Sequence, residues 1–337
     1  NLGEGYVRLR VSEAERRQAK HDIQHVEDIV IEMLRNARDA GADKVYLATT
    51  KEDGVRTLVF LDNGSGVPQD MQERIFDARV TSKLESMKMD RWGVHGRGMA
   101  LFSIKQNTDE ARVVASDVDL GSVFKVSVAT DRLGERADQS SWPQAVKDED
   151  GHYVCARGPH NIIRAACEFA LEELRACDVY LGSPSEIAAT LHAQASSRLD
   201  ASRLLFIDDE AELPVVDRLG LASDAEDFIR ICSGLGLEMS ERTAHRILAG
   251  QIKPVRGVTA RLLRERDSSS HASAPVDLAK DRRGLRIAKD DMAQFSRAVE
   301  RDFNDLASRY YLNLCGDPKI RVSRDRITVT FDLAKEE

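Results

Sequence analysis

The sequence predicts an α+β protein whose first part is a two-layer α/β sandwich with a mixed sheet, followed by a helix-rich α+β region. The first observation is a helical pattern over residues 22–40, where apolar side chains recur at three- and four-residue spacing and Gly41 follows as a natural helix end. The second is a pair of strand-like segments, residues 44–49 and 57–61, joined by a short polar turn. Because these strands follow one another without an intervening helix, alternating parallel βαβ units do not fit.

The remaining elements follow in order along the chain. A short helix is predicted at 69–76, a second at 99–105, and strands at 111–115 and 122–129. The predicted divisions are an N-terminal arm, a first domain, a polar linker and a mixed α+β region, at residues 1–21, 22–130, 131–159 and 160–337. The mixed region is expected to contain helices near 161–175, from about 184, and at 225–235, 242–248 and 291–310, with a short strand at 179–181 and a hairpin within 319–331.

Composition limits the class of protein. The 337 residues suffice for two domains, and 42% hydrophobic with 31% charged residues is ordinary for a globular protein. The net charge of −8 argues against attraction to nucleic acid over the whole surface but leaves room for a local basic patch. Five scattered cysteines without a C-x-x-C pair favour reduced thiols over disulfides or zinc. Since no apolar run reaches the roughly 20 residues of a membrane helix, we expect a cytoplasmic protein without membrane contact.

The first chemical motif lies on the helix predicted at 22–40. Glu32, Asn36 and Asp39 stand at i, i+4 and i+7, so they share one helix face. A solvated face is the simple explanation. However, Asn is a poor helix former, and its place between two carboxylates suggests a site for a metal and water. The Asn36 amide oxygen suits Mg²⁺, and Glu32 could orient or deprotonate an attacking water.

The second motif is Asp62-Asn63-Gly64-Ser65-Gly66, directly after a predicted strand. It is ordinary turn chemistry. It could also be a base-binding turn, in which Asp62 accepts the amino proton of adenine while Gly64 and Gly66 let the base approach the backbone.

The third motif is a glycine-rich loop, Gly93-Val94-His95-Gly96-Arg97-Gly98, that opens the helix predicted at 99–105. Such a loop can present backbone N–H groups and the positive end of a helix dipole to phosphates. It lacks the G-K-[ST] of a P-loop, and no strand runs directly into it as in a dinucleotide-binding turn. A purely structural loop is the alternative.

Taken together, the order and spacing of the three motifs resemble the ATPase superfamily of DNA gyrase, the ninety-kilodalton heat-shock chaperone, histidine kinases and MutL-type proteins, known as GHKL. The resemblance covers about residues 22–130 and implies the Bergerat-type ATP-binding fold, with ATP and Mg²⁺ as ligands. It implies that Glu32 is the general base, Asn36 the Mg²⁺ ligand and Asp62 the adenine-binding residue.

The same resemblance assigns nucleotide contacts to further loop residues. Gly121-Ser122 is similar to the Gly-Thr that closes the adenine pocket in this superfamily, and Thr81-Ser82-Lys83 resembles the lid segment of MutL-type proteins, where Lys83 could neutralise phosphate charge. The full nucleotide-binding set expected from the resemblance is Asn36, Asp39, Asp62, Gly64, Gly66, Thr81, Ser82, Lys83, Gly93, Gly96, Gly98 and Ser122.

The expected activity is slow, Mg²⁺-dependent ATP hydrolysis that drives lid closure and moves a partner region. A histidine kinase is excluded, because His21 and His25 lie only 15 and 11 residues before Asn36, too close for a separate phosphoacceptor helix. Glu32 favours hydrolysis, since water activation needs a carboxylate. The alternative is a non-hydrolysing ATP sensor that binds a protein or DNA partner.

The rest of the chain departs from the superfamily pattern. It has no clear Q-T-K-type loop, and Lys253, Lys280 and Lys289 are candidates for a phosphate-binding lysine by residue type alone. Residues 241–267 carry seven Lys/Arg against three acids and loosely resemble a helix-turn-helix, so DNA or protein could bind there; a basic solvated helix pair is the alternative. The resemblance also implies a possible homodimer through the arm at 1–21.

Overall fold

The computed structural model describes most of the chain up to residue 263 and shorter pieces beyond it. The described residues are 6–8, 12–13, 17, 21–81, 88–95, 98–199, 209–263, 292, 295–296, 299–300, 303, 312–314, 318–322 and 327–335. They fall into two compact units, Asn1–Ser269 and Ser270–Glu337.

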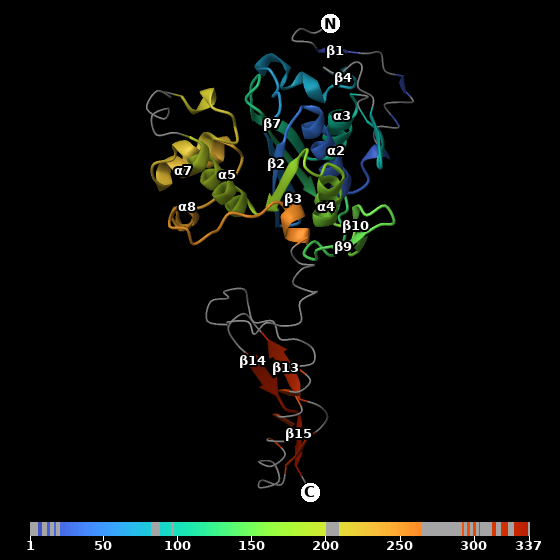
Figure 1. Cartoon of the computed structure of the whole chain (residues 1–337), viewed down its shortest axis with the longest axis vertical. Coiled ribbons are helices and arrows are strands. Elements are labelled where there is room, and N and C mark those ends of the chain that lie inside the picture. The colour runs from blue at the N-terminus through green and yellow to red at the C-terminus, as the bar shows by residue number, and fades with distance from the viewer. Residues whose placement is uncertain are drawn as a thin grey trace. The chain divides into compact units, whose positions relative to one another are not determined.

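The first unit is built on a five-stranded mixed sheet in the order β11-β2-β3-β8-β7 (Figure 1). Its strands are β2 (Lys44–Glu52), β3 (Val55–Asp62), β7 (Glu110–Ser116), β8 (Ser122–Ala129) and β11 (Asp178–Gly182). Strand β11 runs parallel to β2, and every other pair is antiparallel. Asp53 and Gly54 both have positive φ, which gives the tight turn that matches strand twist in a two-residue hairpin between β2 and β3.

One side of the sheet, called here the first face, is covered by α2 (Val26–Asp39), α3 (Ala100–Asn107) and α4 (Ile162–Glu172). A helical segment at residues 258–263 adds Val258 and Leu262 to the same core. Because side chains alternate along a strand, Leu47 of β2 and Leu58 and Phe60 of β3 all enter this core, together with the apolar side of α2. Gly41 ends α2 with φ +77°, as its sequence position predicts.

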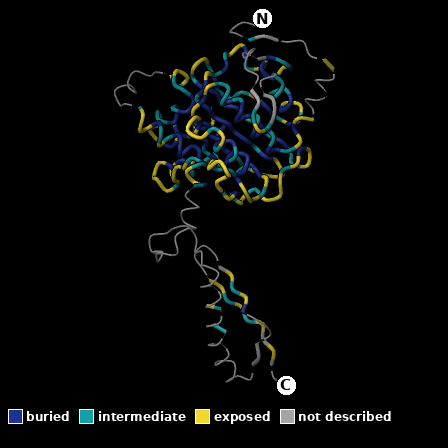
Figure 2. The backbone as a smooth tube through the Cα atoms, turned by 45° about the vertical axis from the view of Figure 1, so that its right-hand side comes forward, coloured by how far each residue is buried: buried dark blue, intermediate teal, exposed yellow. Residues whose placement is uncertain are grey.

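Three more helices cover the opposite side, called here the second face. They are α5 (Pro184–Arg198), α7 (Ala225–Gly234) and α8 (Glu241–Leu248), joined by the 3₁₀ turns η3 (Glu210–Glu212) and η4 (Arg218–Leu221). Tyr46, Val59 and Leu61 point from the strands into this second core. Figure 1 shows the strands between the two helix groups, and Figure 2 shows buried positions concentrated along the strands. The predicted α+β fold with a mixed sheet is confirmed, and α5, α7 and α8 add a third layer that the sequence pattern did not indicate.

Two segments differ in detail from the sequence expectations. Residues 69–76 form two 3₁₀ turns, η1 (Gln69–Met71) and η2 (Arg74–Phe76), rather than a helix. The segment is held by burial of Met71, Ile75 and Phe76 instead of by continuous helical hydrogen bonds. Within the polar stretch 131–159, β9 (Gln144–Lys147) and β10 (Tyr153–Arg157) form an antiparallel pair.

The remaining strands form short antiparallel pairs. They are β1 (Val7–Arg8) with β4 (Val80–Thr81), β5 (Lys88–Asp90) with β6 (Gly93–His95), β12 (Leu312–Leu314) with β15 (Leu333–Lys335), and β13 (Lys319–Val322) with β14 (Ile327–Thr330). The last pair corresponds to the predicted C-terminal hairpin. The helix expected at 291–310 lies largely outside the described residues. Among the described residues, no helix has the length and apolar character needed to cross a membrane.

Candidate functional site

A cavity of about 480 Å³ opens on the first face between α2, the turn after β3, the start of α3 and the beginning of β8. It collects seven of the residues that the sequence motifs single out: Glu32, Asn36, Asp39, Asp62, Gly66, Gly98 and Ser122. Its apolar wall consists mainly of Phe60, Val67, Ile75, Val80 and Phe124. The cavity therefore combines an apolar side with a polar, acidic edge supplied by α2.

The polar edge of α2 is a consequence of helix periodicity. Ile29, Val30 and Leu34 are fully buried against the sheet, which turns Glu32 and Asn36 toward the cavity rim. The Asn36 amide nitrogen Nδ2 is buried and has no hydrogen-bond partner among the described residues. This N–H donor is the kind of group that an acceptor oxygen of a ligand satisfies. The amide oxygen of Asn36, which lines the same cavity, is the atom whose chemistry fits Mg²⁺.

An arginine holds the Glu32 carboxylate from within the same helix. Arg35 is 3% exposed, and its Nη1 donates to Glu32 Oε1 at 2.7 Å. The other side of the Arg35 guanidinium makes a bidentate pair with Asp90 at the end of β5, at 2.9 and 3.0 Å. A guanidinium held in this fork geometry fixes its partners in position and stabilises their charged forms. Glu32 is thereby held in position at the cavity.

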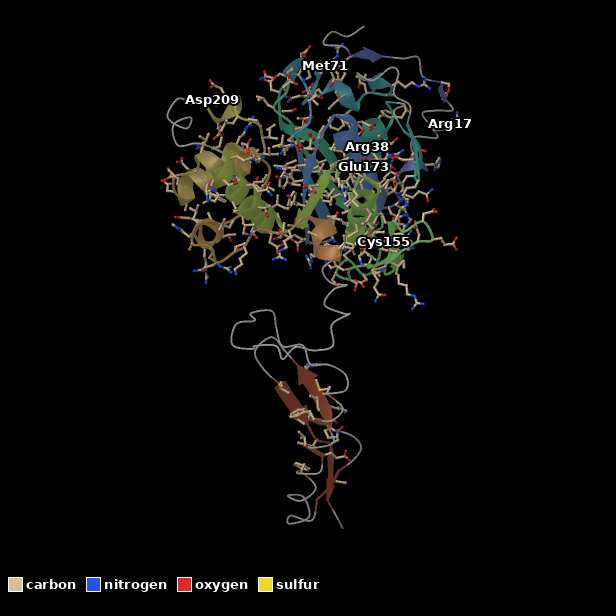
Figure 3. The ribbon with its side chains drawn as sticks, in the orientation of Figure 1. Arg17, Arg38, Met71, Cys155, Glu173 and Asp209 are labelled. Carbon is tan, nitrogen blue, oxygen red and sulfur yellow. The ribbon has the colours of Figure 1, made fainter. Side chains whose placement is uncertain are left out.

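A second arginine extends this ion-pair network to α4. Arg38 lies within 3.0 Å of Asp39, 3.2 Å of Asp90 and 3.1 Å of Glu173, the C-cap residue of α4. Figure 3 labels Arg38 and Glu173, whose side chains meet beside the sheet. Burial alone would lower the pKa of Arg38, but the hydrogen bond and charge of Asp39, with hydrogen bonds to Glu173 and Asp90, raise it. The network joins α2, the β5–β6 hairpin and α4.

Asp62 lies at the end of β3, 4% exposed, and its Oδ1 accepts the N–H of Gly64 at 2.8 Å. The turn that follows packs against the loop between β7 and β8. A Cβ at Gly66, whose φ is +72°, would lie 1.8 Å from the Asp117 carbonyl oxygen. A Cβ at Gly121, with φ +77°, would lie 2.1 Å from the Asp62 carbonyl oxygen. Both positions therefore require glycine for sterics as well as for backbone conformation.

Buried hydroxyl groups fasten these two loops together. Ser116 Oγ accepts the Val67 N–H at 2.7 Å and donates to the Gly121 carbonyl oxygen at 2.8 Å. It also lies 3.1 Å from Ser122 Oγ. Because all of these groups are buried, the hydrogen bonds make the floor of the cavity rigid.

The opposite end of the cavity is formed by the start of α3. Gly98 has φ +65°, and its carbonyl oxygen accepts the Arg79 N–H at 2.8 Å. The N-cap of α3 is Met99, and no side chain caps the helix. Together with Ala100 and Leu101, Met99 lines the cavity, so the positive end of the helix dipole faces it. This end of the cavity is suited to an anion such as a phosphate.

The other predicted residues lie beside the cavity or outside the described part of the chain. Gly64 packs behind it, where a Cβ would lie 2.8 Å from the Ala40 carbonyl oxygen. Gly93 pairs with Asp90 in the β5–β6 hairpin, and Thr81 pairs with Val7. The three remaining positions, Ser82, Lys83 and Gly96, lie outside the described residues.

The motifs did not reveal Arg35, Asp90 or Ser116. The available signal for Arg35 was its spacing of three residues from Glu32, which places the two side chains together on a helix. Asp90 is 55 residues from Arg35 in the chain, so only the folded structure brings them together. Ser116 could have been suspected from its place at the end of a predicted strand, near Ser122.

Comparison with known proteins agrees with this geometry. Residues 23–116 match the family model described as "Histidine kinase-, DNA gyrase B-, and HSP90-like ATPase". The matched segment lies within the part of the chain that forms the cavity, and the mixed five-stranded sheet with its helices is consistent with the Bergerat fold of the GHKL ATPases. The family match supports nucleotide binding as the general activity of this segment.

Among individual proteins, the chain is similar to the DNA mismatch repair protein MutL of Staphylococcus aureus. The proteins of strains Newman, JH1 and N315 are each 28% identical over 136 residues, which is 37% of this chain and 20% of the relative. The similarity therefore spans about a fifth of the length of these relatives.

Proposed function

We propose that residues 22–130 bind ATP with Mg²⁺ and hydrolyse it slowly, and that closure over the nucleotide changes the conformation of neighbouring regions. The observation that supports this most is the meeting of Glu32, Asn36, Asp62, Gly98 and Ser122 in one cavity, although they come from four separate segments. Its volume of about 480 Å³ lies within the usual range of small-molecule sites.

In this proposal the apolar end of the cavity holds the adenine ring. Asp62 accepts a hydrogen bond from the adenine amino group, because its carboxylate is fixed at the end of β3. Gly64 and Gly66 shape the turn, and Ser122 completes the buried floor. The phosphates lie toward Gly98 and the start of α3, with Gly93, Gly96, Thr81, Ser82 and Lys83 in the covering lid.

The Asn36 amide would hold Mg²⁺, with Asp39 on the next turn of the helix as its neighbour. Bound Mg²⁺ supplies neutralisation of the negative charge on the phosphates. Glu32 accepts the proton of the attacking water at its carboxylate. Arg35 holds that carboxylate in place through the 2.7 Å ion pair. The protein would therefore be an ATP hydrolase.

The test is Mg²⁺-dependent ATP binding, by calorimetry, and hydrolysis, by phosphate release, for the wild type and two variants. Glu32→Ala is expected to bind ATP with little change and to lose turnover by about 10²-fold or more, because only proton transfer is removed. Asp62→Asn is expected to weaken binding about tenfold or more, since a buried acceptor becomes partly a donor. Asp70→Asn, an exposed carboxylate outside the cavity lining, serves as the matched control.

A second candidate function is a non-hydrolysing ATP sensor. The Arg35–Glu32 ion pair favours it to the extent that a guanidinium makes a carboxylate a weaker base. Tight ATP binding without turnover in the wild type would select the sensor. Absence of ATP binding would contradict both candidates.

The proposal extends to partners. A homodimer formed through residues 1–21 is expected to appear in sedimentation only with a nonhydrolysable ATP analogue, and an unchanged monomer would contradict it. Residues 241–267 are the proposed contact for DNA or a protein, with residues 131–159 as the connection between the ATP-binding domain and the following region. We place the protein in the cytoplasm.

A further inference from the structure

The connection between α7 and α8 is a short, well-defined turn. Leu237 N–H donates to the Cys232 carbonyl oxygen at 2.8 Å, and Gly236 N–H donates to the Ser233 carbonyl oxygen at 3.0 Å. With Gly236 at φ +69°, this is a Schellman motif, which ends a helix and reverses the chain. Leu237 is fully buried, so the turn is pinned to the second-face core.

Helix α8 has equally definite ends. Ser240 accepts the Thr243 N–H as the N-cap residue. At the other end Gly250, with φ +68°, donates to Ile247, and Gln251 donates to the Arg246 carbonyl oxygen at 2.9 Å. Helices α7 and α8 are thus two short helices joined by the connection 235–240, which contains a left-handed glycine and is longer than the turn of a standard helix-turn-helix.

The two sides of α8 differ sharply in chemistry. Ala244 and Ile247 are buried against the core that contains Phe228 of α7. The exposed side carries Arg242 and Arg246, one helical turn apart, with His245 between them. These three residues line a shallow hollow with Glu241, Ala249 and Gln251.

The loop after α8 adds two exposed cations, Lys253 and Arg256. This loop is fixed to α5, because the Val255 N–H donates to Thr190 Oγ1 at 2.9 Å and Thr190 is fully buried. We call Arg242, His245, Arg246, Lys253 and Arg256 the α8 basic surface. Its cations are attached to an ordered backbone.

The α8 basic surface also differs from other exposed cations of the chain. Arg112 pairs with Glu110 at 2.6 Å, Arg132 with Asp109 at 2.7 Å and Arg230 with Glu210 at 2.6 Å. Within the described part of the chain, by contrast, no carboxylate forms an ion pair with the Arg or Lys side chains of the α8 basic surface, and Glu241 contacts only His245, at 3.7 Å. In a chain of net charge −8, a group of unneutralised cations is a local attraction for anions.

We infer that the α8 basic surface contacts the phosphate backbone of duplex DNA, with α8 held in place by its packing against α7. This inference chooses DNA as the partner of the proposed function. It rests on the proposed function only where DNA binding would be coupled to ATP. A protein partner fits less well, because the cores of protein interfaces are depleted in charge and rich in aromatic residues. Phe, Tyr and Trp are absent from the lining residues of the hollow, which are Glu241, Arg242, His245, Arg246, Ala249 and Gln251. An α-helix of this kind fits the major groove, with its N-terminal residues toward the bases.

The experiment is fluorescence anisotropy of the full chain with a labelled, mixed-sequence DNA duplex, without nucleotide and over a salt series. We expect binding whose affinity falls with salt. The double variant Arg242→Ala/Arg246→Ala is expected to bind about tenfold or more weakly and to reduce the slope of log K against log salt by about 2, since each lost phosphate contact contributes about 0.9.

The matched control is Arg112→Ala/Arg132→Ala, which also removes two exposed arginines, with side chains 49% and 50% exposed. It should change the affinity less than about twofold. Equal thermal melting of both double variants would establish that they fold. No duplex binding at low salt, or equal losses in both double variants, would overturn the inference, and a protein partner would then be the better proposal. Because the assay contains no ATP, its outcome is independent of whether the chain hydrolyses ATP.

Discussion

The two faces of the sheet bury different kinds of residue, although they share the same strands. On the first face, charged and hydroxyl groups such as Arg35, Asp62 and Ser122 are almost fully buried beside the cavity. The second face is closed by a nearly continuous aliphatic and aromatic core. The difference shows that the first face combines an apolar core with fixed networks of buried polar groups beside the cavity, whereas the second-face core consists mainly of apolar side chains.

The largest expected effect comes from removing an aromatic ring on the second face. Phe228 is fully buried and contacts the His192 ring edge-to-face at 5.5 Å. Phe228→Ala should lower the free energy of unfolding by about 3–5 kcal/mol, because it leaves a cavity in a close-packed core. ATP affinity of the folded fraction should not change, since Phe228 lies across the sheet from the cavity. Urea denaturation and calorimetry measure the two quantities, with Val118→Ala, 49% exposed, as the control. A parallel loss of ATP affinity would show that the faces are coupled.

A smaller but different effect is expected from the ion-pair network of the first face. Asp90→Asn removes a charge that Arg35 and Arg38 share, and leaves two arginines underneutralised in a buried setting. Loss of one member should cost about 3 kcal/mol of unfolding free energy. Unlike Phe228→Ala, it should also slow ATP turnover, because Arg35 would no longer hold Glu32 in place. The control is Asp109→Asn, an exposed carboxylate paired with Arg132, expected to cost less than about 1 kcal/mol. Equal stability losses in the two variants would argue against a special role for the network.

The smallest effect concerns pH. Burial alone would raise the pKa of Glu135, but hydrogen bonds and charges from Arg56 and Lys51 lower it below its ordinary value of 4.5. Since the folded pKa is the lower one, Glu135 stabilises the fold fully above about pH 4.5 and loses this contribution as the pH falls through the folded value. In Glu135→Gln the melting temperature should therefore fall less than in the wild type as the pH is lowered from neutral to acid. Glu149→Gln, which changes an exposed carboxylate, should show the same fall as the wild type. If Glu135→Gln also shows the wild-type fall, other groups cause the loss of stability in acid.

Much of the fold was predictable from local pattern. Strand β8 begins and ends where the sequence pattern places it, and α2 ends at the predicted glycine. Single turns were less predictable, because η1 and η2 depend on burying Met71 and Phe76 rather than on helical periodicity. The third layer could not be predicted, since amphipathic helices do not indicate which face of a sheet they cover.

The site shows the same division between local and distant information. Glu32, Asn36 and Asp39 were found because helix geometry alone places them together. The glycine turns were found because glycine-rich segments are recognisable in the sequence. Whether these residues act as assigned is still a prediction. Asp90 could not be assigned, because its partners Arg35 and Arg38 are 55 and 52 residues away and the contact depends on tertiary packing.

The parallel pairing of β11 with β2 has a practical consequence for dividing the chain. Val179 and Leu181 belong to the first-face core, although they lie well beyond the segment, 23–116, that matches the ATPase family. A chain shortened to residue 130 would leave β2 as an open sheet edge with unpaired backbone groups, and such an edge is a template for aggregation. The smallest soluble fragment that retains the nucleotide cavity should therefore continue at least through β11 and its covering helix α5.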